Sequence, residues 1–181
     1  KQRDSMKKVT CVHKSNVMRI TDGVFVKACT EVSKDYPDII FEQMYVDACA
    51  MNLIRQPEQF DVIVTTNLFG DILSDESSQV VGGLGMAPAA NLGDNFALFE
   101  PVHGAAFDIA GQNIANPSSF LLSIKMMLDW LGAKHNDQKC FEVAMKLEST
   151  IFDLVKSGIK TKDIGGDKTT LEFTKQITDH L

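Results

Sequence analysis

The sequence predicts an α/β fold, in which strands and helices alternate along the chain. Short apolar, β-branched runs at 9–12, 39–44 and 60–65 are each followed by a segment with the apolar spacing of a helix. The composition, 44% hydrophobic and 23% charged, is that of a globular protein, and there is no internal repeat or low-complexity segment. Such alternation favours mixed sheets with helices on both faces.

The first part of the chain carries the clearest elements. We expect strands at 9–12, 39–44 and 60–65, and helices beginning at Thr21, at 46–54 and from about Asp71 to Val81. A loop rich in glycine, proline and asparagine should follow to Asp94, then a short strand at 97–99 and an irregular segment at 100–116. The remaining helices are expected at 118–130, 137–155 and 169–181, with a loop at 158–168.

Charge and cysteine content exclude some classes of function. The net charge is -6 and no basic cluster is longer than Lys7-Lys8, so we expect no nucleic-acid partner. We also expect no membrane association, because no apolar run is long enough to span a bilayer. The four cysteines form no C-x-x-C pair and lie in apolar contexts, which predicts buried free thiols and a cytoplasmic protein. The chain begins with polar residues and without methionine, so we expect a fragment that carries no secretory signal.

Charged residues that follow predicted strands are the candidate site. Asp71 and Asp75 are four residues apart, which puts both carboxylates on one helical face. Such a pair is usually a solvated acidic face, but it can also be a ligand set for Mg²⁺ or Mn²⁺, and its place after a buried strand strengthens the case for the ligand set. Asp47 follows another strand, as a helix N-cap or a third ligand. Lys14 also follows a strand, as a solvated lysine or a proton carrier.

A second unusual stretch runs from Glu100 to Gly111. It is long, irregular and rich in small residues, features that are common in functional loops. It is not a G-x-G-x-x-G fingerprint, so a standard Rossmann site is not supported. Asp108 could accept hydrogen bonds from a ribose and repel a 2′-phosphate, or it could form only an Asx-turn.

Four segments, in this order, resemble the isocitrate/isopropylmalate dehydrogenase family over nearly the whole chain. They are Lys14-Ser15-Asn16-Val17, Tyr45-Val46-Asp47, Asn67 to Asp75, and Glu100 to Gly111 with Ile114 to Pro117. The resemblance implies that Lys14 and Asp47 are catalytic and that Asn16 lies near substrate and nicotinamide. It implies that Asp71 and Asp75 bind the metal together with Asp47 of a second subunit. It also implies that NAD is bound by a set of loop residues, namely Glu100, His103, Gly104, Ala106, Asp108, Ile109 and Asn116. Phe107 stands where the family more often has proline.

The resemblance also implies a reaction: NAD-dependent, Mg²⁺- or Mn²⁺-dependent oxidative decarboxylation of a 2-hydroxy acid. Local residues favour 3-isopropylmalate, and hence leucine biosynthesis, over the alternatives isocitrate and homoisocitrate. A non-catalytic subunit of a heteromeric dehydrogenase is the alternative of another class. It is disfavoured because Lys14, Asp47, Asp71 and Asp75 are all present.

The implied architecture is an isopropylmalate dehydrogenase-like fold, present as an incomplete C-terminal portion. Residues 1–81 would belong to the smaller, dimer-forming domain and residues 82–181 to the cofactor-binding domain. We expect a homodimer with shared active sites. The family's catalytic tyrosine and substrate-binding arginines have no match here, so the fragment alone is expected to be inactive.

Overall fold

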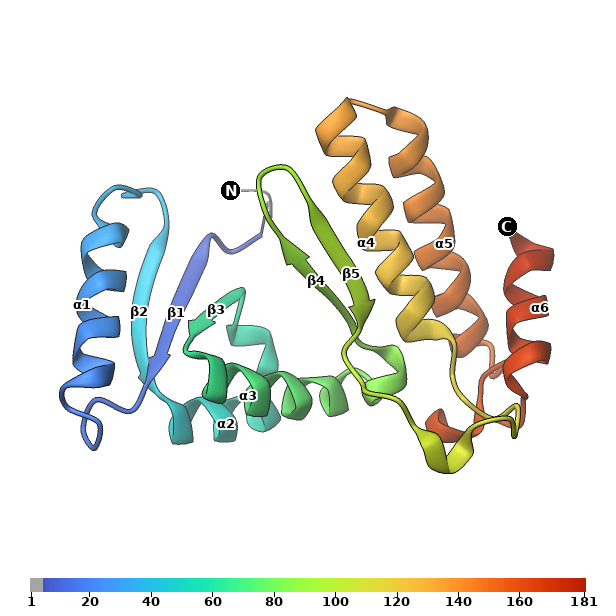
Figure 1. Cartoon of the computed structure of the whole chain (residues 1–181), viewed down its shortest axis with the longest axis horizontal. Helices are drawn as coiled ribbons and strands as arrows, with labels where there is room; N and C mark the ends of the chain where they lie inside the picture. The colour runs from blue at the N-terminus through green and yellow to red at the C-terminus, as the bar shows by residue number, and fades with distance from the viewer. Residues whose placement is uncertain (1–4) are drawn as a thin grey trace. The chain divides into compact units, whose positions relative to one another are not determined.

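The computed structural model describes residues 5–181 and divides them into two compact units (Figure 1). The first unit ends at Val80 and the second runs from Val81 to Leu181. Residues 1–4, on which the expectations of a fragment and of no secretory signal depend, lie outside the described residues. Each unit has its own hydrophobic core.

The first unit is built on a parallel sheet. Its strands are β1 (Lys8–His13), β2 (Ile40–Tyr45) and β3 (Val62–Thr65), in the order β2-β1-β3. Helices α1 (Thr21–Ser33), α2 (Val46–Arg55) and α3 (Asn67–Val80) follow the three strands in turn. Because the strands are parallel, their carboxyl ends lie at one edge of the sheet, where His13 pairs with Tyr45 and Val12 with Thr65.

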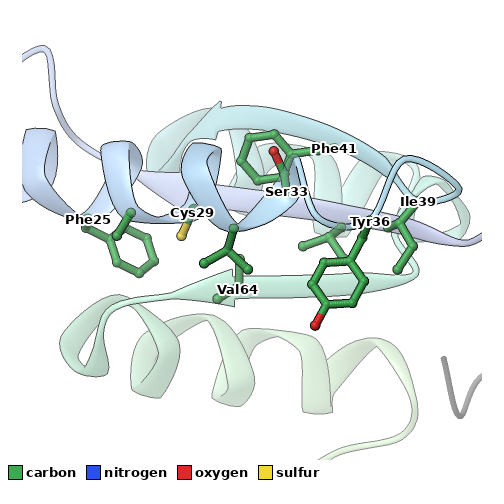
Figure 2. Close-up of a pocket in the computed structure, with 10 residues that line it drawn as sticks. Phe25, Cys29, Ser33, Tyr36, Ile39, Phe41 and Val64 are labelled. Carbon is green, nitrogen blue, oxygen red and sulfur yellow. The ribbon is translucent and has the colours of Figure 1, made fainter.

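Both faces of the central strand are buried, as is usual for a parallel sheet. On one face Val12 packs with Cys49 and Leu53 of α2 and Leu73 of α3, all at most 5% exposed. On the other face Val9, Phe41 and Val64 line a pocket of about 560 Å³ under α1. Phe25 and Cys29 of α1 face Val64 of β3 across this pocket (Figure 2). The pocket wall is apolar and contains none of the predicted site residues.

The second unit begins with a hairpin and continues with helices. Strands β4 (Pro88–Leu92) and β5 (Ala97–Pro101) pair antiparallel and lie beside α4 (Ser118–His135) in Figure 1. Helices α5 (Gln138–Lys156) and α6 (Thr170–His180) complete the unit. Its core consists of Met86, Leu122, Leu147, Ile151, Leu154, Phe173 and Ile177.

Local signals explain where these helices begin and end. Asn136 ends α4 in the left-handed conformation (φ 52°), and the Asp137 side chain accepts a hydrogen bond from the Lys139 N–H at 2.9 Å at the start of α5. Thr169 and Glu172 form a reciprocal capping box at the start of α6, since each side chain bonds to the other residue's backbone N–H. These caps satisfy backbone groups that a helix leaves without partners.

Several predicted boundaries were wrong. Helix α3 begins at Asn67, not near Asp71, so Asp71 lies beyond the first turn and gains nothing from the helix start. The expected loop before Asp94 contains strand β4, and the expected irregular segment contains the end of β5 and a 3₁₀ helix at Phe107–Ile109. All four cysteines are free, but only Cys11 and Cys49 are fully buried.

Candidate active site

Lys14 and Asp47 meet at the carboxyl edge of the parallel sheet. Lys14 directly follows β1, and Asp47 is the second residue of α2, directly after the neighbouring strand β2. The Lys14 Nζ donates to Asp47 Oδ1 in a direct ion pair. The helix cap position is occupied by Tyr45, so the structure excludes the N-cap alternative for Asp47. Two predicted site residues are therefore in contact.

The ion pair keeps Asp47 in its charged form. The hydrogen bond from Lys14 lowers the pKa of the Asp47 carboxyl, and a backbone N–H in the first turn of α2 lowers it further. The Asp47 side chain is 65% exposed and the Lys14 side chain 25% exposed. Asp47 is thus an ionised carboxylate that a cation could reach from solvent, while the stem of Lys14 is partly packed.

An aromatic pair supports Lys14 from the sheet. The Lys14 Nζ lies 5.9 Å from the centroid of the Tyr45 ring, within the range of a cation–π contact. Tyr45 makes an edge-to-face contact with His13, with ring centroids 5.3 Å apart. His13 is only 4% exposed, and burial lowers its pKa, so it is neutral near pH 7. Its Nδ1 accepts the Ser15 N–H at 3.2 Å, whereas its buried Nε2 has no hydrogen-bond partner among residues 5–181.

Asn16 lies in the turn that carries Lys14. Its side chain is exposed, and the turn is closed by the Val17 and Met18 N–H groups, which donate to the Lys14 carbonyl at 2.9 and 2.8 Å. Lys14 and Asn16 therefore share one hydrogen-bonded turn at the carboxyl end of β1. Sequence reasoning did not identify Asp22, whose buried carboxylate accepts the Lys14 backbone N–H at 2.6 Å.

Asp71 and Asp75 lie on exposed positions of α3, one turn apart. Within residues 5–181 neither carboxylate accepts a hydrogen bond or forms an ion pair, so both retain their oxygens for a ligand. The described residues contain no group of three or more acidic, histidine or cysteine side chains that could hold a metal ion. Asp47 and the α3 pair are therefore not gathered into one metal centre within a single chain.

The predicted cofactor residues lie in the second unit, on β5 and the segment after it. Glu100 is exposed on β5 and accepts a hydrogen bond from Asn91 at 3.1 Å. His103, Gly104, Ala106 and Asp108 are exposed, and Ile109 is half-buried. Asp108 and Ile109 belong to the 3₁₀ helix, which leaves the Asp108 carboxylate open to a ligand.

Asn116 ends this segment and is held on both sides. Its Nδ2 donates to Asp163 Oδ2 at 3.0 Å, and its Oδ1 accepts the Ser118 N–H at 3.0 Å, at the start of α4. Its Nδ2 also donates to Met86 Sδ at 3.6 Å, so both amide hydrogens have partners within the second unit. Asp163 was not predicted as a site residue, although it belongs to the segment Lys162-Asp163-Ile164-Gly165-Gly166, which resembles the family's C-terminal signature.

The start of α6 holds the C-terminal end of the segment that follows β5. The Thr170 hydroxyl donates to the Ala115 carbonyl at 2.5 Å, and the Leu171 N–H donates to Asn113 Oδ1 at 3.0 Å. Asn113 adopts a left-handed conformation (φ 58°), which asparagine tolerates better than most residues. The loop is thus anchored after residue 112, whereas His103 to Ala106 are exposed.

Comparison with known proteins shows the family of this chain. A protein-family model described as isocitrate/isopropylmalate dehydrogenase matches residues 1–181. The chain belongs to the isocitrate/isopropylmalate dehydrogenase family. A 3-isopropylmalate dehydrogenase of Sulfurisphaera tokodaii is 54% identical over 176 residues, which are 97% of this chain and 52% of that protein. A homoisocitrate dehydrogenase of Methanocaldococcus jannaschii is 49% identical over 179 residues, 99% of this chain and 49% of that protein.

A solved structure supports the fold of this family member. The crystal structure of isocitrate dehydrogenase from Methylococcus capsulatus matches with a TM-score of 0.88 and 41% identity, over 96% of this chain and 50% of that one. The chain therefore spans about half the length of the relatives it matches. Among the described helices, none combines the length and apolar character needed to cross a membrane.

Proposed function

We propose that this chain forms part of an NAD-dependent, metal-dependent dehydrogenase that oxidises and decarboxylates 3-isopropylmalate in leucine biosynthesis. The observation that carries the proposal is the contact between Lys14 and Asp47 at the carboxyl edge of the parallel sheet. Binding sites of open α/β folds lie at this edge. The four free cysteines support a reducing, cytoplasmic location.

The carboxylates fit a hard divalent cation. Asp47 is ionised, and Asp71 and Asp75 present unpartnered oxygens on one face of α3, which is the ligand chemistry that Mg²⁺ and Mn²⁺ prefer. Because the three carboxylates form no single group within one chain, we propose that Asp47 of a second copy completes the ligand set. This supports a homodimer with shared active sites. When bound, the cation would polarise the oxygens of the 2-hydroxy acid.

NAD fits the segment after β5. The exposed Asp108 carboxylate can accept hydrogen bonds from ribose hydroxyls, and its charge would repel the 2′-phosphate of NADP. Exposed residues 103–106 include Gly104, where no atom lies within 4 Å of an added Cβ, so this backbone is open to a dinucleotide. NAD⁺ would accept hydride from the hydroxyl-bearing carbon.

Within this scheme Lys14 handles the hydroxyl proton. Its Nζ is at the end of a partly packed stem, beside the Tyr45 ring and in contact with Asp47. In its neutral form, the Lys14 amine can accept the proton of a substrate hydroxyl and become the ammonium that pairs with the Asp47 carboxylate. We propose that residues 1–181 alone do not catalyse the reaction, since the family's catalytic tyrosine and substrate-binding arginines have no match in them.

The proposal is tested by measuring NADH formation in a full-length dehydrogenase that carries these residues. We expect Mg²⁺-dependent activity with 3-isopropylmalate. Activity with isocitrate alone, or with homoisocitrate alone, would refute the substrate assignment and leave the reaction class intact. Replacing Asp71 by Asn should sharply lower metal-dependent turnover, and unchanged turnover would refute its role as a ligand. The matched control is Asp153→Asn, which changes an exposed acid on α5 outside the site.

A further inference from the structure

The loop between β1 and α1 begins with a hydrogen-bonded turn. It carries Lys14 and Asn16, and it ends where α1 begins at Thr21. The Lys14 carbonyl accepts the Val17 and Met18 N–H groups at 2.9 and 2.8 Å, and the Asp22 N–H donates to the Met18 carbonyl at 3.1 Å. These bonds shape the turn, but they do not hold its first residue onto the rest of the unit.

Asp22 supplies that connection. Its Oδ2 accepts the Lys14 backbone N–H at 2.6 Å, across eight residues of sequence. Asp22 is 2% exposed, and within the described part of the chain this is the only hydrogen bond that its side chain accepts. A buried carboxylate is costly to keep without a partner, and a hydrogen bond to a charged acceptor is stronger than a neutral one.

The position of Asp22 in the first turn of α1 offers a simpler explanation, since acids are favoured at helix starts. Acids in that role are usually exposed or bond to free N–H groups of their own helix. Asp22 is buried and bonds to Lys14, the first residue of the loop, while the cap position, Ile20, has no side-chain hydrogen bond. The direction of the carboxylate therefore indicates a role for the loop rather than for the helix alone.

We propose that Asp22 is a positioning residue for Lys14. By holding the Lys14 backbone, it keeps the Nζ in contact with Asp47 and keeps Asn16 in place over the same edge of the sheet. The anchoring is a property of this chain and is independent of any reaction. Its consequence for catalysis rests on the proposed dehydrogenase function.

Amide hydrogen exchange of the 181-residue chain, followed by NMR, tests the anchoring. In the wild type the Lys14 amide should be protected. In D22A it should exchange at least tenfold faster while the amides of β1 keep their protection. D22N retains a weaker, neutral acceptor, so its Lys14 amide should exchange at an intermediate rate. D35A is the matched control, because it removes an exposed acid from the loop after α1 and should change neither rate.

A chemical readout tests where the Lys14 amine lies. Trace acetylation with acetic anhydride, quantified by mass spectrometry, gives the reactivity of Lys14 relative to exposed Lys27. D22A should raise this ratio severalfold, because Lys14 leaves its contact with Asp47. Unchanged Lys14 exchange and labelling in D22A would overturn the proposal. If D22A does not fold, D22N provides the test instead. A Lys14 amide exchange rate in D22N equal to that of the wild type would overturn the proposal.

Kinetics of a full-length dehydrogenase test the catalytic consequence. D22A should lower kcat on the order of 10- to 100-fold with little change in KM, as expected when a reacting group is misplaced. D22N should restore part of the loss, and D35A should behave as the wild type. A kcat of D22A equal to that of D35A would overturn the positioning role. If K14A kept full activity, the proposed function would fail, whereas the exchange result for Asp22 would still stand.

Discussion

Gly85 is a position where a single methyl group should disturb the candidate cofactor segment. It lies in the 3₁₀ helix Leu84–Met86, and a Cβ added there would lie 2.8 Å from Asp163 Oδ2 and 2.9 Å from Asn116 Cβ. The Asp163 carboxylate ends a side chain and can rotate away. Asn116 cannot move as easily, because its Oδ1 also accepts the Ser118 N–H at the start of α4. Gly85→Ala must therefore displace Asn116 or the backbone around it.

The size of the effect follows from these contacts. Overpacking a well-packed site costs about 1–3 kcal/mol. Because Asp163 is exposed and can move, we expect the lower part of that range, about 1–2 kcal/mol, including a weakened Asn116–Asp163 hydrogen bond. For a unit of this size about 1 kcal/mol corresponds to roughly 4–8 °C in Tm. Gly85→Ala should thus lower the Tm of the second unit by roughly 5–15 °C.

Thermal unfolding followed by the fluorescence of Trp130 measures this directly, since Trp130 is the single tryptophan and lies on α4 of the second unit. Gly104→Ala is the matched control. No atom lies within 4 Å of its added Cβ and its φ is not left-handed, so its Tm should change little. If both variants melted at the same temperature, the close approach at Gly85 would have no energetic consequence and the reasoning would be wrong.

Three further predictions concern single side chains. Asp47→Asn should strongly lower metal-dependent turnover of a full-length dehydrogenase yet barely change its Tm, because the Asp47 side chain is 65% exposed and an ion pair at an exposed carboxylate contributes little to stability. Retained turnover would contradict the role of Asp47 in the site. Burial lowers the pKa of His13 below its ordinary value of 6.5 in the folded chain. As the pH falls through 6.5, the unfolded chain therefore binds a proton before the folded chain does, and the free energy of unfolding decreases. His13→Gln should therefore reduce the loss of unfolding free energy in urea between about pH 7 and pH 5, and an unchanged loss would argue against this origin. Thr169→Ala removes the capping box with Glu172 and should cost about 1 kcal/mol in urea unfolding, whereas an unchanged midpoint would show that the cap is dispensable.

Local patterns predicted most of the fold. The apolar runs and helical spacings located β1, β2, β3 and their helices, because burial on one or both faces selects residues along each element. Strand β4 was missed because its sequence, Pro88-Ala89-Ala90-Asn91-Leu92, has little strand propensity. It becomes a strand by pairing with β5, a contact that local periodicity does not encode.

The candidate site was predicted only in part. Lys14 and Asp47 were selected because each follows a strand, and the parallel pairing of β1 with β2 brings them together. The start of α3 was misplaced although Thr66, a residue type favoured at helix N-caps, directly precedes Asn67. Helical spacing selected Asp71 and Asp75 as a pair, and the resemblance to the family implied their role as metal ligands. Cys29 and Cys140 lie in apolar sequence but are only half-buried, because apolar neighbours in sequence do not determine how a helix packs.

The two residues that sequence reasoning missed have the same role in different units. Asp22 accepts a hydrogen bond from the backbone of Lys14, and Asp163 accepts one from the side chain of Asn116. Neither was predicted as a ligand residue, and each lies well away in sequence from the residue it holds, by 8 and by 47 positions. A residue that must meet a ligand in one geometry needs such support, because an exposed loop otherwise samples many conformations. Supporting acids of this kind can be identified only from the folded structure, because their hydrogen bonds depend on tertiary contacts and not on local sequence spacing.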